Sequence, residues 1–168
     1  MAERIILKAR IAAVYFADVI TSEEKLDLMS ETDWIQQPIT LRDDEISITE
    51  GEPEESEVNS HENDAPEDYD IAGTGLSVVG TFIKATWEQM AELMGGTATV
   101  NAYKHSSKKL ILEKAIRFKL KNGGEFIVPC AKGSVQFNGN AGYDGLLSHP
   151  FRFRALAQTG FDTDLIVR

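Results

Sequence analysis

The sequence predicts a mainly β protein, a two-sheet antiparallel β-sandwich or barrel with one flanking α-helix. Three observations support this fold class. Several short segments alternate apolar and polar residues, which is typical of strands with one buried face. One segment carries the start and stop signals of a helix. The order of strands, one helix and more strands suits antiparallel sheets better than βαβ units, which would need several helices.

Alternating strand patterns recur along the chain. They are found in residues 46–49, 116–120 and 151–156, the last directly after Pro150. The link 121–124 contains Asn122, Gly123 and Gly124, which tolerate positive φ. Residues 116–120 and 125–128 are therefore expected to form a hairpin.

The remaining β signals are less regular. Residues 5–16 are rich in apolar and β-branched side chains and are predicted to be a strand, whereas residues 21–37 are predicted to be a long loop. Two further β-rich runs, 71–84 and 97–103, flank the predicted helix. A turn cluster at 138–142 follows the run 134–137.

The helix is predicted for residues 86–94. Thr86 and Gln89 have the spacing of a capping box, and Gly95 with Gly96 ends the helix. An apolar stripe at spacings of three and four is expected to pack onto a sheet as a lid. The stripe consists of Trp87, Met90, Ala91 and Met94.

Length and composition predict one domain, residues 1–168, with a real core, because 42% of the 168 residues are apolar. No apolar run reaches the roughly 18 to 20 residues that a membrane helix needs. Lys8 and Arg10 interrupt the apolar N-terminus and spoil a signal peptide, so synthesis in the cytosol is expected. The lone Cys130 is expected to be a small buried hydrophobe.

Charge is strongly polarised. Between Asp43 and Asp70 lie thirteen of the 27 acidic residues, one His and no Lys or Arg, which leaves 17 basic against 14 acidic residues elsewhere. The net charge of -10 therefore belongs to this acidic segment. Such a segment does not bury enough apolar surface to offset its ordering entropy alone, and it repels nucleic acid. A simple solvated acidic loop is the other interpretation.

Basic residues gather further along the chain, between residues 104 and 121, with Glu113 the single acid among them. They are Lys104, Lys108, Lys109, Lys114, Arg117, Lys119 and Lys121. A nucleic-acid patch is one interpretation, although no aromatic residues interleave with these charges. The other is a subunit contact, in which acidic and basic surfaces associate head to tail.

No residue pattern predicts catalysis, a cofactor or a metal site. None of His61, His105 and His149 lies at a metal-ligand spacing from another His or Cys. Neither Cys130 nor Ser148 lies in a recognisable nucleophile motif. The sequence therefore favours a protein that is not an enzyme.

Taken in order, these features resemble the major tail tube proteins of long-tailed bacteriophages and the related inner-tube proteins of contractile injection systems. The resemblance covers roughly residues 39–156 and rests on a succession of features, not on one signature. These are residues 46–53, the acidic arm to Asp70, the run 76–82, the helix 86–94 closed by Gly95 and Gly96, and the hairpin at 122–124.

The resemblance implies a structural virion protein of the phage tail, assembled in the host bacterial cytoplasm alongside other tail proteins. Its β-sandwich would form hexameric rings that stack into a hollow tube. The bore of such tubes is typically acidic, so DNA, with about one negative charge per 1.7 Å of axis, slides through during ejection without specific binding. No cofactor or membrane is implied.

Candidate residues follow from this resemblance. The residues expected to line the lumen are Glu50, Glu52, Glu54, Glu55 and Glu57. The remainder of the arm to Asp70 is expected to fold against the adjacent ring and to become ordered on assembly. The expected basic subunit contacts are Lys104, Lys108, Lys109, Arg117, Lys119 and Lys121. Two alternatives stay open: a stand-alone acidic binding module, such as a DNA mimic, and another ring-forming tail or baseplate component.

Overall fold

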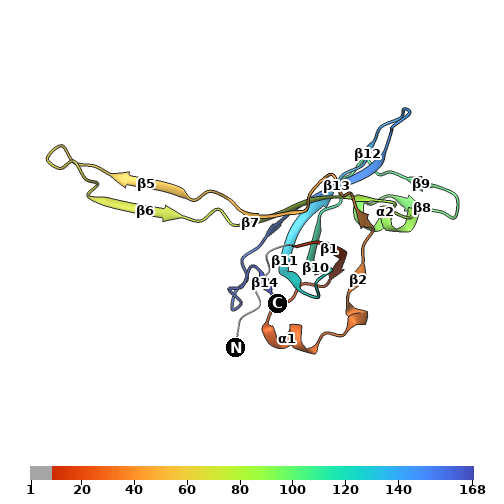
Figure 1. The fold of residues 1–168 in the computed structure, drawn as a ribbon, viewed down its shortest axis with the longest axis horizontal. Helices are drawn as coiled ribbons and strands as arrows, with labels where there is room; N and C mark the ends of the chain where they lie inside the picture. Colours follow the sequence, from red (N-terminus) through yellow and green to blue (C-terminus); the bar gives the residue numbers. More distant parts are fainter. Residues whose placement is uncertain (1–8) are drawn as a thin grey trace.

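The computed structural model describes residues 9–168 and is mainly β, with one large antiparallel sheet and two small two-stranded sheets (Figure 1). The strands of the large sheet are β1 (Ile11–Ala17), β2 (Ile35–Gln36), β3 (Ile39–Thr40), β4 (Ser47–Glu50), β7 (Leu76–Ile83), β10 (Leu112–Leu120), β11 (Glu125–Val135), β12 (Asn138–Gly139), β13 (Leu147–Ala155) and β14 (Ile166–Val167). The small sheets pair β5 (Glu54–Val58) with β6 (Asp68–Ala72) and β8 (Thr97–Ala98) with β9 (Tyr103–Lys104).

The large sheet is not closed. Its strands follow the order β2-β1-β10-β11-β13-β7-β3, with β4 also on β7, β12 on β13 and β14 on β11. The strands at the two ends of this order, β2 and β3, follow each other in the chain. β2 pairs with β1, and β3 pairs with β7. Gln37 and Pro38 join them without a ladder between β2 and β3. The predicted antiparallel β architecture is therefore confirmed, whereas a closed barrel or a second sandwich sheet is not.

The main core lies on one face of the sheet. Its largest side chains include Phe82, Phe118, Phe151 and Phe153, all buried, and Phe82 stacks on Phe151 with ring centroids 4.4 Å apart. The same face carries Val14 and Ile116 from neighbouring strands. Alternate residues of each strand thus fill a single apolar layer.

Helix α2 (Trp87–Met94) covers this core, as predicted. The Thr86 side chain accepts from the Gln89 amide and the Gln89 side chain accepts from the Thr86 amide, which confirms the capping box. The buried face consists of Met90, Leu93 and Met94. Trp87 was wrongly assigned to this face, because it is 42% exposed in the first helical turn.

The hairpin of β10 and β11 is confirmed. Phe118 lies opposite Phe126, and Lys119 lies opposite Glu125 next to the turn. Gly123 has a φ of 90°, in the region that glycine adopts readily, and its amide donates to the Leu120 carbonyl. The sequence placed this turn correctly because its requirement is local.

The predicted loop at 21–37 is wrong. It contains helix α1 (Glu23–Leu28), a 3-10 turn η1 (Glu31–Asp33) and the short β2. Ser22 caps α1 by accepting from the Lys25 amide, but α1 has only six residues and buries only Leu26. So short a helix leaves no periodic signal, and it is stabilised by packing instead.

We call residues 21–37 the excursion. The excursion covers half of the outer face, which is the side of the sheet opposite the main core. A second apolar cluster forms there from the sheet, the excursion and the C-terminal segment. It contains Ala17, Ile20, Leu26, Trp34, Ala115, Ile127 and Phe161. Residues of β10 and of the first half of β11 are therefore buried on both faces.

Most other predicted strands fall where expected, within a few residues. Of the predicted run 97–103 only the two ends are strand, in β8 and β9, and β12 lies inside the predicted turn 138–142. β4 and β13 contain the predicted runs 46–49 and 151–156 in large part, and β7 lies within the predicted run 71–84. β1 begins at Ile11, inside the predicted strand 5–16, of which residues 5–8 lie outside the described part. Cys130 is buried, as predicted.

Candidate assembly surfaces

The arm, defined here as the β5–β6 hairpin of residues 54–72, projects away from the body of the molecule (Figure 1). Every residue of both strands is exposed. The arm holds eight carboxylates and no Lys or Arg. At its base the Gly51 amide donates to the Gly75 carbonyl, and Arg154 donates to the Thr74 carbonyl at 2.7 Å.

The two faces of the arm differ. Directly opposed residues of an antiparallel pair share a face. Opposition of Glu55 to Ile71 and of Glu57 to Tyr69 therefore places these four side chains together, on what we call the aromatic arm face. A hydrogen bond to Glu55, together with the charge of Glu57, raises the pKa of Tyr69, which agrees with this placement. The opposite, acidic arm face carries Glu54, Ser56, Val58, Asp68, Asp70 and Ala72.

The five glutamates expected to line a lumen do not share one face. Glu50 belongs to β4 and pairs with Leu76 of the large sheet, and Glu52 lies between β4 and β5. Glu54 points to the acidic arm face, whereas Glu55 and Glu57 point to the aromatic arm face. The alternation of strand side chains prevents all five from facing one bore. The sequence shows no apolar alternation here, because five of the eight residues from Glu50 to Glu57 are acidic and none is a large apolar residue.

The six basic contact candidates also separate. Lys104 on β9 and the following Lys108 and Lys109 lie before the start of β10, and all three are exposed. Lys121 lies beyond the other end of this nine-residue strand, which is roughly 30 Å away at about 3.3 Å per residue. The cations therefore do not form a single patch.

Arg117 is not available as a subunit contact, which corrects the prediction. It is 3% exposed, and its guanidinium lies 4.6 Å from the Tyr15 ring centroid and 4.7 Å from that of Trp34. It donates to both carboxylate oxygens of Glu31, at 3.1 and 2.9 Å. These bonds and the Arg117 charge lower the pKa of Glu31 to about 2. Lys119 joins the same carboxylate at 3.4 Å.

The contacts of Arg117 with Tyr15, Trp34 and Glu31 hold the excursion against the sheet. Glu31 comes from η1 and Trp34 directly follows it, whereas Tyr15 and Arg117 come from paired strands. The two aromatic rings and the Glu31 carboxylate stabilise the buried charge, although the Arg117 Nε has no hydrogen-bond partner among the described residues. The sequence shows only an alternating strand at residues 116–120, and this local pattern does not contain the contacts of Arg117 with Glu31 and Trp34.

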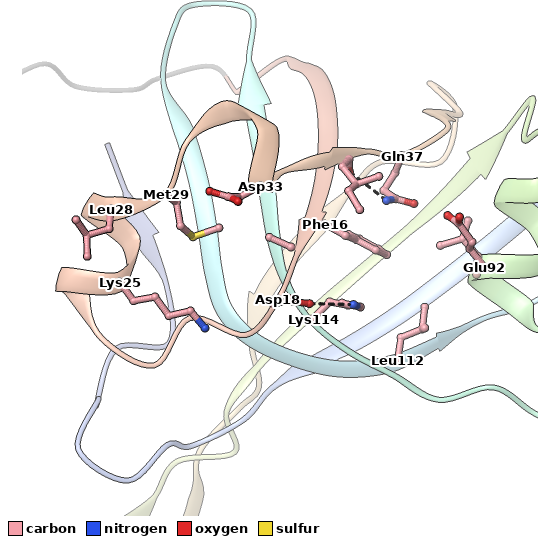
Figure 2. Close-up of a pocket in the computed structure, with 13 residues that line it drawn as sticks. Phe16, Asp18, Lys25, Leu28, Met29, Asp33, Gln37, Glu92, Leu112 and Lys114 are labelled. Atoms are coloured by element: carbon pink, nitrogen blue, oxygen red, sulfur yellow. Dashed lines mark hydrogen bonds and ion pairs between the residues drawn. The ribbon is translucent and has the colours of Figure 1, made fainter.

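A groove with a volume of about 610 Å³ lies between the excursion and the end of the sheet (Figure 2). Its charged groups are largely engaged internally. Lys114 forms a 3.3 Å ion pair with Asp18, and the Lys25 ammonium donates to the Val19 carbonyl. Its lining contains no serine, cysteine or histidine. The groove therefore lacks the serine or cysteine nucleophile and the histidine base of a serine- or cysteine-type hydrolase.

The histidines and the cysteine do not form a reactive cluster. His149 is fully buried, and neither ring nitrogen has a hydrogen-bond partner among the described residues. Burial lowers the pKa of His149 below 6.5. Burial and the neighbouring Glu113 raise the pKa of Cys130, which disfavours the thiolate. In residues 9–168 no group of three or more His, Cys, Asp or Glu is placed to hold a metal ion.

A basic surface that sequence reasoning missed lies on the uncovered half of the outer face. It carries Lys132 on β11 with Arg152 and Arg154 on β13, all exposed. The alternation in 151–154 placed the two arginines on one face. Their approach to Lys132 depends on the register of two strands separated by residues 136–146, which include the short β12.

No protein-family model matches the sequence, and the comparison with curated proteins found no match. Within residues 9–168, no helix has both the length and the apolar character needed to span a membrane.

Proposed function

We propose that this protein is a structural tail tube subunit, which forms hexameric rings that stack into a hollow tube with an acidic lumen for DNA passage. Its partners are further copies of the chain and other tail proteins, and its location is the virion tail, built in the bacterial cytoplasm. The proposal rests on the sequence resemblance and includes the two-sheet sandwich that the resemblance implies.

The observation that carries the proposal is the arm. An isolated two-stranded hairpin is marginally stable in water, and this one has both faces exposed and a run of mutually repelling carboxylates. An extended strand pair of this kind is stabilised when another surface covers it. Self-association supplies such a surface without a second gene product.

The arm also supports an acidic bore. Because only one arm face can be covered by a flat neighbour, the other stays open to solvent. If the aromatic arm face is covered, Glu54, Asp68 and Asp70 point into the open space. Carboxylates there repel the phosphates of DNA, so a duplex slides and does not bind.

Electron microscopy of the purified protein across concentration and salt tests the proposal. Hollow tubes with six subunits in each turn or ring are expected. Isolated rings that never stack would favour a different tail or baseplate component. Particles that stay monomeric under every condition would contradict the proposal and favour a stand-alone acidic module.

A further inference from the structure

The uncovered half of the outer face is a largely polar patch built from the five strands β10, β11, β13, β7 and β4. Two rows of side chains cross it in register. The first row is Glu113, Lys132, Arg154, Ser77 and Thr49. The second row is Ser134, Arg152, Val79 and Ser47. We call this surface the basic face.

Its charge is unbalanced. Lys132 lies directly opposite Arg154 and diagonally to Arg152 on the adjacent strand, where like charges repel. Glu113 at one end of the first row is the single carboxylate in the two rows. Within the described residues, Lys132 and Arg152 form no ion pair. Val79, 40% exposed, adds an apolar spot beside Arg152.

We propose that the basic face binds the aromatic arm face of a second copy of this chain. This inference rests on the self-association in the proposed function and assigns the surface that receives the arm. Glu55 and Glu57 meet Lys132 and Arg152, while Tyr69 and Ile71 pack over Val79 and the arginine side chains.

The occupant is a second copy because the two surfaces are complementary and separate. The arm carries eight carboxylates without a cation, and the basic face carries three cations with one carboxylate. The arm leaves the sheet at β4 and β7 and points away from the body, so its own basic face is out of reach (Figure 1). Tyr69 and Ile71 are about half exposed and gain burial only on such a partner.

The contact is small, and this fits a polymer. Strands of five residues are roughly 17 Å long at about 3.3 Å per residue, so one arm covers well below the roughly 800 Å² per partner of a stable complex. Repetition around a ring supplies the missing affinity through effective concentration. Mutual charge fixes register more than strength.

Carbodiimide coupling of the unmodified protein is the first test. This reagent joins a carboxylate to an amine in direct contact, and Lys132 is the one amine of the basic face. Isotope-labelled and unlabelled protein are mixed before coupling, and peptides are analysed by mass spectrometry. Mixed-label links from Lys132 to Glu55 or Glu57 are expected. Tubes or rings without these links would overturn this inference and leave the proposed function standing.

Charge reversal is the second test. K132E/R152E and E55K/E57K are each expected to raise the concentration needed for assembly at least tenfold, and an equal mixture of the two variants is expected to restore assembly. The matched control K108E/K109E changes the same charge away from the basic face and is expected to stay within twofold of wild type.

The outcomes separate the two proposals. Assembly of K132E/R152E at the wild-type concentration contradicts the basic face as the receiving surface. Mixed-label links in a protein that forms dimers but never rings or tubes support the inference and contradict the tube. Duplex DNA binding that K132E/R152E abolishes, with no Lys132 link to an arm, would identify the basic face as a nucleic-acid surface and overturn the inference.

Discussion

The β10–β11 and β5–β6 hairpins share one architecture, two antiparallel strands joined by a loop, but have opposite surroundings. β10 is nine residues long and β11 eleven, and much of each is buried on both faces between the main core and the second cluster. The arm has five residues in each strand, all exposed. Burial of side chains stabilises the first hairpin, whereas backbone hydrogen bonds are the main intramolecular support of the second.

This difference separates two roles within one chain. The β10–β11 hairpin stabilises the body, because it carries side chains into both apolar clusters. The arm contributes little to the folding of its own chain, and its sequence is therefore free to serve a partner. Substitutions in the two hairpins should accordingly change different measured quantities.

The largest expected effect is on the free energy of unfolding of F118A. Phe118 is fully buried in the main core, so its truncation is expected to cost about 3 to 5 kcal/mol. The matched variant in the arm, Y69A, is expected to change the unfolding free energy by less than about 0.5 kcal/mol. Urea denaturation of both variants measures this, and equal losses would contradict the comparison.

The next effect concerns the outer face of the β10–β11 hairpin. R117A removes the guanidinium stacked between Tyr15 and Trp34 and is expected to cost about 2 kcal/mol. Because Glu31 loses its bidentate partner, hydrogen exchange at residues 23–34 is expected to rise before that of β10 and β11. R117K keeps the charge, and its free energy of unfolding should lie between those of wild type and R117A. Uniform exchange in all elements would contradict the fastening role.

A pH-dependent effect is expected from His149 in the body. Its folded pKa lies below 6.5, so the unfolded chain binds the proton more readily, and stability is expected to fall as pH drops below about 6.5. H149L removes this dependence, because an apolar side chain suits a site where neither ring nitrogen is bonded. Thermal unfolding of both proteins from pH 5 to 7.5 measures it. Parallel curves would contradict the assignment.

The parts of the fold that the sequence predicted are those with local causes. The capping box at Thr86 and the glycine turn at Gly123 each require particular residues at fixed spacing, and both are present. The strand alternation in 116–120 also indicated the correct faces. Helix α1 escaped prediction because six residues with one buried side chain carry no period.

The candidate surfaces depend on pairing between distant segments, which local patterns do not contain. The strand pattern predicts that Arg117 is a surface cation, but in the structure Trp34 and Glu31 of the excursion cover it. Conversely, no local pattern around Lys132 predicts that it lies beside Arg154, because this position depends on the pairing of β11 with β13. Charge counts along the chain therefore found the acidic arm, but they treated the buried Arg117 as a surface cation and missed the basic face of Lys132, Arg152 and Arg154.

The smallest expected effect on folding is in the arm, where E55Q/E57Q removes two charges from the aromatic arm face. Since both side chains are exposed, the melting temperature of the monomer is expected to stay within about 2 °C of wild type. If repulsion between arms limited assembly, removing these charges would lower the concentration needed for assembly. The proposed contact predicts the opposite change. In the proposed contact these carboxylates meet Lys132 and Arg152, so E55Q/E57Q should assemble at higher concentration than wild type, whereas E54Q on the other face should not. Light scattering at matched salt distinguishes these results, and easier assembly of E55Q/E57Q would show that arm repulsion, not arm attraction, controls polymer growth.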